Sequence, residues 1–460
     1  MSDWKAMERE AERFRRDIRA LPVTAPSDPL ALRRRLETRY NFAAPHSLCD
    51  LTEDVSALLR DHTVHVTHPC YFGLFNPSVR DAGIVADFLA ALYNPQLAAW
   101  SHAPAACEIE RLTLRHLGSL IGFDTETLSA SFTTGGAEAN LCAVLAALAH
   151  YGSEAGYDGV AALPARPAIY VSGESHHSFV KIARMTGLGT DALRAVATTP
   201  QYTMDPEDLA ARILSDRTEG WKPLLIVGTA GTTSSGAVDP LVALADIAGE
   251  ADLWFHVDAA WAGAVVLSPR LRPVLAGIGR ADSVTWDAHK WLSVPMGAGM
   301  FFCRHPRAVR NAFAASTSYM PDAVLGGAED PYTTSVQWSR RAIGLKVFMA
   351  LAELGDSGYA ELIEHQAAMG DLLRAKLRSA GWLVVNQEIL PVICFTHDRI
   401  RCGQRSTHDL LQTLYARGRA WISDVVLGGN ERVLRACITS YHTTPADIDV
   451  LLAELNYALQ

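Results

Sequence analysis

The chain has 460 residues, of which 49% are apolar and 20% charged, and its formal net charge is −9 at pH 7. This length provides a large core in two or three lobes, while mixed acidic and basic residues without a basic stripe exclude nucleic acid and an anionic membrane surface as partners. The N-terminus lacks the apolar core of a signal peptide, and no apolar run reaches membrane-spanning length, so we expect a cytoplasmic protein. The eight cysteines form no CxxC pair, so we expect reduced thiols and no metal site.

The first 65 residues have the pattern of a helical arm. In "WKAMEREAERFRRDI" (4–18) apolar side chains recur at three- and four-residue steps and form one stripe. An arm of this size has little core of its own, so we expect it to pack on another lobe or on a second subunit. Helical patterns resume at 82–94 and 105–123.

Between residues 130 and 305, short apolar runs alternate with helical segments. The runs are continuously apolar, as is typical of strands that helices cover on both faces. The candidate strands are 168–173, 223–231, 253–260, 282–288 and 299–305. Most intervals are long enough for a crossover helix, which predicts a mostly parallel α/β sheet. The interval before residue 299 is too short for one, so the last strand is expected to be antiparallel.

A loop and a smaller lobe follow the sheet. Residues 318–335 contain two prolines and a glycine pair, the composition of a loop, and an amphipathic helix is expected at 340–355. The remainder has the pattern of a smaller α+β domain. We therefore divide the chain into an N-terminal helical arm (1–65), a large α/β domain (66–340) and a small C-terminal α+β domain (341–460).

A pair of glycines precedes a strong helix-forming segment in "TTGGAEAN" (133–140). The free N–H groups in the first turn of a helix attract an anion, and Gly135 and Gly136 would let a phosphate approach the backbone closely. An ordinary glycine turn before a helix is the alternative interpretation.

An acid ends the apolar run in "FHVDAAWAG" (255–263). There, an unpaired carboxylate would be costly. Asp258 therefore either caps the following segment or provides the counter-charge for a protonated heteroaromatic nitrogen. Ala259 and Ala260 would then form a flat floor on which the ring lies.

A lysine follows that acid by 32 residues, about one β–α–β unit later, so both residues are expected to end neighbouring strands. Lys290 lies between Trp286 and Trp291, just past a buried strand. Its ammonium group either reaches solvent along its apolar stem or is kept as a nucleophile.

Two further strand ends carry polar side chains. His176 and His177 follow the strand at 168–173, and Thr229 lies near the end of 223–231. Open α/β sheets bind their ligands at this edge, where an imidazole could stack on a planar ring. An anion cradle, a stacking imidazole, a buried acid and a desolvated lysine together indicate pyridoxal 5′-phosphate, which uses all four.

The motifs resemble those of the pyridoxal-phosphate-dependent group II decarboxylases, over roughly residues 65–455. "HPCYFGLFNPS", "WSHAPAACEIE", "TTGGAEAN", "HVDAAWAG", "DAHKW" and "LRACITSYHTT" occur in the family's order. The resemblance implies the fold type I architecture of the aminotransferase superfamily, which is a mostly parallel, seven-stranded-type sheet sandwiched by helices, with a smaller C-terminal domain.

The resemblance also implies roles around the cofactor ring. Lys290 matches the lysine that forms the imine, and Asp258 matches the partner of the pyridine nitrogen. His177, rather than His176, is matched to the imidazole that stacks on the ring. Thr229 matches a threonine beside the ring substituents, and Ala260 belongs to the floor under the ring.

Further roles concern the phosphate and the loop. Gly135, Gly136 and Ala137 match the phosphate cradle, and His289 lies where the family also contacts phosphate. Residues 318–335 match the loop that closes over the substrate. On that loop, Tyr332 is the candidate for the tyrosine that assists protonation of the carbanion, one residue from the family's position when counted from Arg340.

The implied reaction is decarboxylation of an L-amino acid to the corresponding amine. Three alternatives stay open: decarboxylation with oxidative deamination to an aldehyde, an aminotransferase or lyase, and an inactive homologue. An aminotransferase would require an arginine for the substrate carboxylate, and nothing in the local sequence supports Arg435 in that role. The substrate side chain can be aliphatic, aromatic or basic. We expect a homodimer with active sites at the interface, because the arm and the loop both suit a neighbouring subunit.

Overall fold

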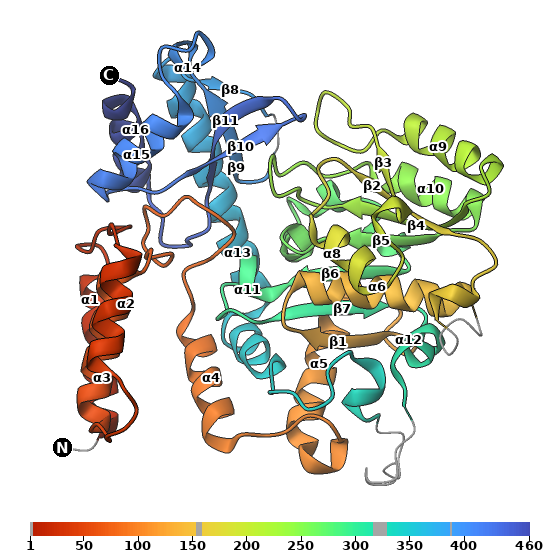
Figure 1. The fold of residues 1–460 in the computed structure, drawn as a ribbon, viewed down its shortest axis with the longest axis horizontal. Coiled ribbons are helices and arrows are strands. Elements are labelled where there is room, and N and C mark those ends of the chain that lie inside the picture. Colours follow the sequence, from red (N-terminus) through yellow and green to blue (C-terminus); the bar gives the residue numbers. More distant parts are fainter. Residues whose placement is uncertain (1–2, 153–158, 316–328, 387–388) are drawn as a thin grey trace.

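The computed structural model describes residues 3–152, 159–315, 329–386 and 389–460. Figure 1 shows a helical N-terminal arm, a large sheet between helices and a smaller C-terminal sheet beside the arm. None of the helices in these parts of the chain combines the length and hydropathy needed to cross a bilayer.

The arm is helical, as predicted. It consists of α1 (Asp3–Asp17), α2 (Pro29–Arg39) and α3 (Leu48–His62). Helices α1 and α3 pack against each other, yet Trp4 on α1 and Leu59 on α3 are each 60% exposed. The arm therefore has little core of its own in the single chain.

Two helices connect the arm to the sheet. They are α4 (Asp81–Tyr93) and α5 (Pro104–Ile121), close to the predicted 82–94 and 105–123. A proline begins α5 at the position where its missing N–H costs nothing, and Gly122 ends it with a left-handed φ of 103°.

Seven strands form the large sheet. In spatial order they are β1 (Ser129–Thr133), β7 (Gly299–Cys303), β6 (Ser283–Asp287), β5 (Trp254–Asp258), β4 (Lys222–Thr229), β2 (Pro167–Ser172) and β3 (Leu193–Val196). The pairs among β2 to β6 are parallel, whereas β7 is antiparallel to both β6 and β1. The mostly parallel sheet and its antiparallel strand are thus confirmed, while β1 and β3 were not predicted.

Helices cover both faces of this sheet. One buried cluster joins the strands to α6 (Gly136–Tyr151), α8 (Ser178–Met185) and α12 (Pro306–Phe313). The larger buried cluster packs α5, α9 (Pro206–Thr218) and α10 (Leu241–Ala251) against the strands. Two separate cores explain why the strand sequences are apolar throughout instead of alternating.

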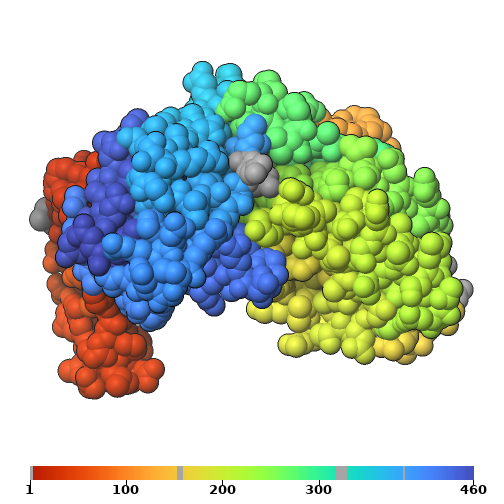
Figure 2. Space-filling view, turned by 90° about the horizontal axis from the view of Figure 1, so that it is seen from above, coloured from red at the N-terminus to blue at the C-terminus, as the bar shows by residue number. Residues whose placement is uncertain are grey.

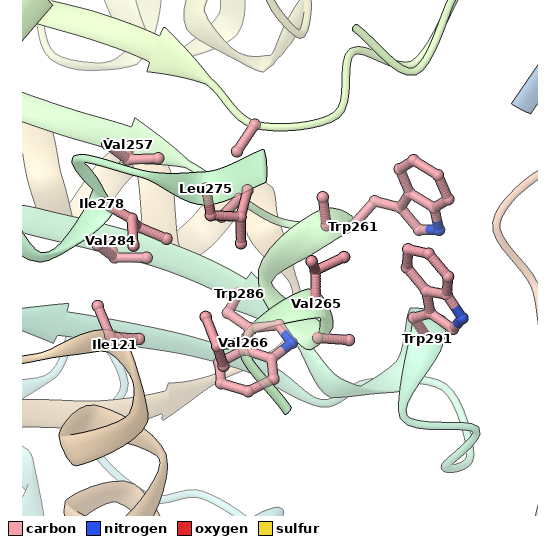
Figure 3. Close-up of a cluster of buried hydrophobic side chains, with 14 of the residues drawn as sticks. Ile121, Val257, Trp261, Val265, Val266, Leu275, Ile278, Val284, Trp286 and Trp291 are labelled. Carbon is pink, nitrogen blue, oxygen red and sulfur yellow. The ribbon is translucent and has the colours of Figure 1, made fainter. Parts of the chain in front are cut away.

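The crossover from β5 to β6 contains short 3₁₀ helices, at Ala262–Leu267, Arg272–Leu275 and Ile278–Arg280, where an α-helix is usual. These turns pack their apolar side chains around Trp286, which is fully buried (Figure 3). A Cβ on Gly263 would lie 2.5 Å from the Trp286 ring. The tight crossover therefore depends on a glycine at this position.

The C-terminal part begins with α13 (Gly344–Ser379), which has a non-helical residue, Gly355, with φ 67°. The helix predicted at 340–355 ends at this break. Beyond it lies an antiparallel sheet with the order β10 (Ser423–Leu427), β11 (Glu431–Cys437), β9 (Val392–Thr396) and β8 (Leu383–Val384).

The C-terminal sheet has its own core with α14 (Asp398–Arg401), α15 (Thr407–Arg417) and α16 (Pro445–Leu459). Figure 2 shows this part (blue) between the arm (red) and the large sheet region (yellow to green). The domain limits at residues 65 and 340 stay a prediction, although the separate sheets and cores agree with them.

Candidate active site

The predicted residues meet at the carboxyl edge of the parallel strands. Thr229 ends β4, Asp258 ends β5, and β6 ends at Asp287. The short helix α11 (Ala288–Trp291), which carries Lys290, follows β6 directly. Asp258 lies opposite Thr285 in the β5–β6 pair, so the two strands are neighbours as predicted. Their side chains line a cavity of about 230 Å³.

Lys290 points into this cavity and does not reach past it into solvent. Its Nζ lies 3.2 Å from Oδ2 of Asp287, and its side chain is 21% exposed. The ammonium also lies 5.6 Å from the centre of the Phe75 ring. Of the two interpretations of this lysine, the geometry favours an amine held beside a binding site.

Asp258 is 4% exposed and is held by two donors. Its Oδ2 accepts a hydrogen bond from Nδ2 of Asn140 at 2.8 Å, and its Oδ1 accepts one from the N–H of Ala260 at 3.1 Å. The contact with Ala260 is the capping role considered above. Because the carboxylate also lines the cavity, it can hold a ligand in addition.

The glycine pair begins α6 beside the same cavity. Gly135 is the N-cap residue, and no side chain in the described structure caps this helix end. A Cβ on Gly136 would lie 2.9 Å from Oδ2 of Asp287 and 3.1 Å from Cβ of Ala260. A side chain at position 136 would therefore clash with Asp287 and Ala260. The first-turn N–H groups at Gly136 and Ala137 line the cavity and can bind an anion there.

His289 lies beside these glycines and is buried. Its Nδ1 accepts a hydrogen bond from the N–H of Ala298 at 3.2 Å, and its Nε2 lies 3.8 Å from Oδ2 of Asp287. Burial lowers the pKa of His289, so the neutral ring is favoured. The Cε1 atom would lie 3.4 Å from a Cβ on Gly135, close to the predicted phosphate cradle.

Thr229 lines the cavity at the end of β4. Its N–H donates to Oδ2 of Asp239 at 2.7 Å, and its Oγ1 lies 3.4 Å from Oγ of Ser175. Asp239 is buried, which raises its pKa to about 6. These contacts fix Thr229 from both sides.

The two adjacent histidines differ in their place at the cavity. His176 lines it, whereas His177 is the N-cap of α8 and is not among the described lining residues, although both side chains are exposed. Nδ1 of His176 accepts the N–H of Ser178 at 3.2 Å, which fixes the ring, and desolvation lowers its pKa. The assignment of His177 to the ring stays a prediction, and the lining of the cavity in the single chain favours His176.

Tyr332 does not reach the cavity within the described structure. It belongs to the 3₁₀ turn Pro331–Thr334, and its ring stacks on Trp338 with a centroid separation of 4.7 Å. Most of the predicted loop, residues 318–328, lies outside the described residues.

The sequence analysis did not assign several lining residues, namely Phe75, Thr134, Asn140, Gly231, Thr233, Trp261 and Asp287. Phe75 stacks on Trp261, with ring centres 4.6 Å apart, and Trp261 stacks on Trp291 at 4.7 Å, as Figure 3 shows for the two tryptophans. Asn140 lies one helical turn after Gly136, so its spacing within "TTGGAEAN" could have indicated a shared face.

Arg435 packs on Phe75, which lines the cavity, but is not itself among the described lining residues. Its guanidinium is 4.9 Å from the Phe75 ring centre and donates to the carbonyl oxygens of Gly73 and Ser234. Its Nη2 is buried and makes no hydrogen bond within the described structure. A further acceptor, such as a ligand carboxylate, could therefore satisfy it.

The comparisons with known proteins identify the family of the chain. The pyridoxal-dependent decarboxylase conserved domain matches residues 29–398. Tryptophan decarboxylase 1 of Oryza sativa subsp. japonica is 29% identical over 454 residues, covering 93% of this chain and 87% of its own.

Solved structures match over nearly the whole chain. The crystal structure of Oryza sativa TDC with PLP and tryptamine has a TM-score of 0.92 and 26% identity, covering 100% of this chain and 97% of that one. The crystal structure of mouse CSAD has a TM-score of 0.90 and 27% identity, covering 96% and 94%.

Proposed function

The chain belongs to the pyridoxal-dependent decarboxylase family, and from this premise we propose that it converts an L-amino acid to the corresponding amine. It is a carboxy-lyase with pyridoxal 5′-phosphate as its cofactor. The observation that carries the proposal is that the ammonium of Lys290 and the carboxylate of Asp258 line one cavity.

The residues of this chain fit the cofactor. The cradle at Gly136 is closed to any side chain, because an added Cβ would meet Asp287 and Ala260 within 3.1 Å. Oδ1 of Asp287, beside Lys290, is buried without a hydrogen-bond partner in the described structure. A phosphate at the helix end and a polar ligand beside Lys290 would satisfy both features.

Each group then has one task. When bound, the cofactor supplies an aldehyde for the lysine and a ring that withdraws electrons from the substrate Cα. The N–H groups from Gly135 to Ala137 would hold the phosphate, the carboxylate of Asp258 would accept a hydrogen bond from the ring N–H, and His176 would cover the ring. Oδ2 of Asp287, 3.2 Å from Nζ of Lys290, holds this amine at the cavity, where an incoming amino acid would reach it.

The aromatic stack of Phe75 and Trp261 would cover the substrate and limit water at the reacting carbon. The stack does not choose among aliphatic, aromatic and basic side chains.

An aldehyde product is the second candidate. Within one chain, Tyr332 packs on Trp338 and is not among the described lining residues, so this candidate applies where the loop of the proposed dimer does not bring a tyrosine to the cavity. Without a tyrosine to protonate the carbanion, reaction with oxygen competes with amine formation.

The test is a screen of the purified protein against the common L-amino acids, with carbon dioxide, hydrogen peroxide, amine and aldehyde measured together. Equal amounts of carbon dioxide and amine without peroxide support the first candidate, and peroxide with aldehyde supports the second. A reaction that requires a co-substrate to accept the amino group and releases no carbon dioxide would overturn both candidates.

We also propose a homodimer. Large apolar side chains are exposed on the arm and on the neighbouring α4, for example Trp4 (60%), Leu59 (60%) and Leu92 (58%). A surface of this kind marks an interface. Light scattering should give twice the chain mass of 49.9 kDa, and an active monomer would contradict the proposal.

The eight cysteines are all unpaired in the structure. This state suits a reducing compartment, and we propose the cytoplasm as the place of action. Fractionation of the cells that express the protein would test this.

A further inference from the structure

A chain of polar side chains lies behind Asp258 in the core of the sheet. Asn140 contacts Asp258 at 2.8 Å and, through its Oδ1, Nε2 of His256 at 3.0 Å. Nδ1 of His256 contacts Oγ of Ser283 at 2.9 Å, which in turn contacts Nε1 of Trp254 at 2.8 Å. All five residues are at most 4% exposed. Water cannot satisfy these groups, so they must satisfy one another.

The two end groups fix the direction of every hydrogen bond. The indole N–H of Trp254 can only donate, and a carboxylate can only accept. Asn140 therefore turns its amide nitrogen to Asp258 and its oxygen to His256, which must donate from Nε2. A neutral imidazole then accepts at Nδ1 from the hydroxyl of Ser283, and each residue donates towards Asp258.

His256 is suited to this place. Burial lowers its pKa to about 4, so the neutral form is favoured. A longer polar contact of its ring joins Nε2 and Oγ1 of Thr285 at 3.5 Å. The ring edge also faces Phe179, with centroids 6.4 Å apart. The imidazole thus has one tautomer and one orientation.

Helix α6 connects the chain to the phosphate cradle. Gly136 begins the helix and Asn140 follows four residues later, on the same face. The carboxylate is held at Oδ2 by Asn140 and at Oδ1 by Ala260, which come from different elements. Both ends of a ligand in the cavity are consequently positioned by the same helix.

We propose that Asn140 and His256 are positioning residues, which orient the carboxylate of Asp258 towards the ring nitrogen of pyridoxal 5′-phosphate. The inference rests on the proposed role of Asp258. It predicts that losing the Nε2 donor of His256 lets the carboxylate of Asp258 rotate. The hydrogen bond between this carboxylate and the ring nitrogen would then weaken, while the contacts to the phosphate remain.

The experiment compares two histidine variants as cofactor-free proteins. In H256Q the side-chain amide nitrogen takes the place of Nε2 and keeps the donor to Asn140, whereas H256N places its amide near Nδ1 and lacks that donor. Each protein is titrated with pyridoxal 5′-phosphate and with its deaza analogue, in which C–H replaces the ring nitrogen. Dissociation constants are measured by absorbance, and melting temperatures of the free proteins are recorded.

The wild-type protein should prefer pyridoxal 5′-phosphate over the analogue. In H256N this preference should fall about tenfold, the order expected for a hydrogen bond that acts on a charged group. H256Q should retain it within about twofold. H65N, a change of a buried histidine whose Nδ1 contacts the carbonyl oxygen of Pro22 at 2.7 Å, away from the sheet, is the matched control and should change neither affinity.

Equal losses for both ligands, or none, in H256N would overturn the inference, because a merely structural change does not distinguish the two rings. If H256N does not fold, W254F removes the first donor of the chain, keeps an aromatic ring, and must lower the preference for pyridoxal 5′-phosphate. A wild-type protein that binds neither ligand would instead refute the proposed function.

Discussion

The phosphate cradle makes a sharp prediction for Gly136→Ala. The added Cβ would stand 2.9 Å from Oδ2 of Asp287 and 3.1 Å from Cβ of Ala260. Asp287 is 2% exposed, so its side chain has little room to move away from the added Cβ. Overpacking of this kind costs about 1–3 kcal/mol, against a gain of at most about 1 kcal/mol from replacing a helical glycine.

Gly249 provides the control for this change. It lies on α10 with nothing within 4 Å of an added Cβ, so Gly249→Ala should stabilise the protein by about 0.5–1 kcal/mol through helix propensity alone. Denaturation of the cofactor-free proteins should therefore separate the two variants by about 1–3 kcal/mol.

The same variant tests the site. Because the methyl group must displace Asp287 and Ala260 or shift the first turn of α6, whose N–H groups form the proposed cradle, G136A should bind pyridoxal 5′-phosphate at least about tenfold more weakly than G249A, as expected when charged hydrogen bonds are lost. Cofactor titration by absorbance measures this. Wild-type affinity in G136A would refute the assignment of the cradle.

Two further predictions concern stability. Burial lowers the pKa of His256 to about 4. Between about pH 6.5 and pH 4 the unfolded chain therefore binds a proton at this histidine that the folded chain does not bind. As the pH falls through this range, the free energy of unfolding should decrease by about 3 kcal/mol because of this residue. The difference in unfolding free energy between wild type and H256Q, measured at pH 7 and pH 4.5, should shrink accordingly, and a constant difference would contradict this. Arg340→Met leaves the buried carboxylate of Glu110, now paired at 2.6 Å, without its cation, and should cost about 3–5 kcal/mol in urea denaturation. Adding Glu110→Gln should recover part of this loss, and no recovery would show that the pair is not the cause.

The sequence predicted those strands whose apolar runs face two cores. Strands β2, β4, β5, β6 and β7 are apolar because helices cover both sides. β1 was missed because Ser129, Ser131 and Thr133 are polar, although all three are buried. Its place at the sheet edge, paired only with β7, follows from tertiary contacts that a local pattern does not contain.

The candidate site was predictable where one residue type determines the chemistry. A lysine and an acid at the ends of consecutive strands lie at one edge of the sheet if the strands are parallel neighbours, and Lys290 and Asp258 line the same cavity there. The choice between His176 and His177 does not follow from spacing in this way, because the direction of a side chain in a turn depends on backbone angles.

The contacts behind the site were beyond sequence analysis for a different reason. Asn140 and His256 are 116 residues apart and meet only because α6 packs across the end of β5. Each is an unremarkable polar residue in its own segment. Only the folded chain shows that their hydrogen bonds lead to Asp258.

The central claim is that the amine of Lys290 bonds covalently to the cofactor. Reduction of the cofactor-loaded protein with borohydride, followed by peptide mass mapping, tests it most directly. We predict one pyridoxyl adduct, on Lys290, and none in Lys290→Ala. An adduct on another lysine, or no adduct on a protein that still releases carbon dioxide from an amino acid, would contradict the account.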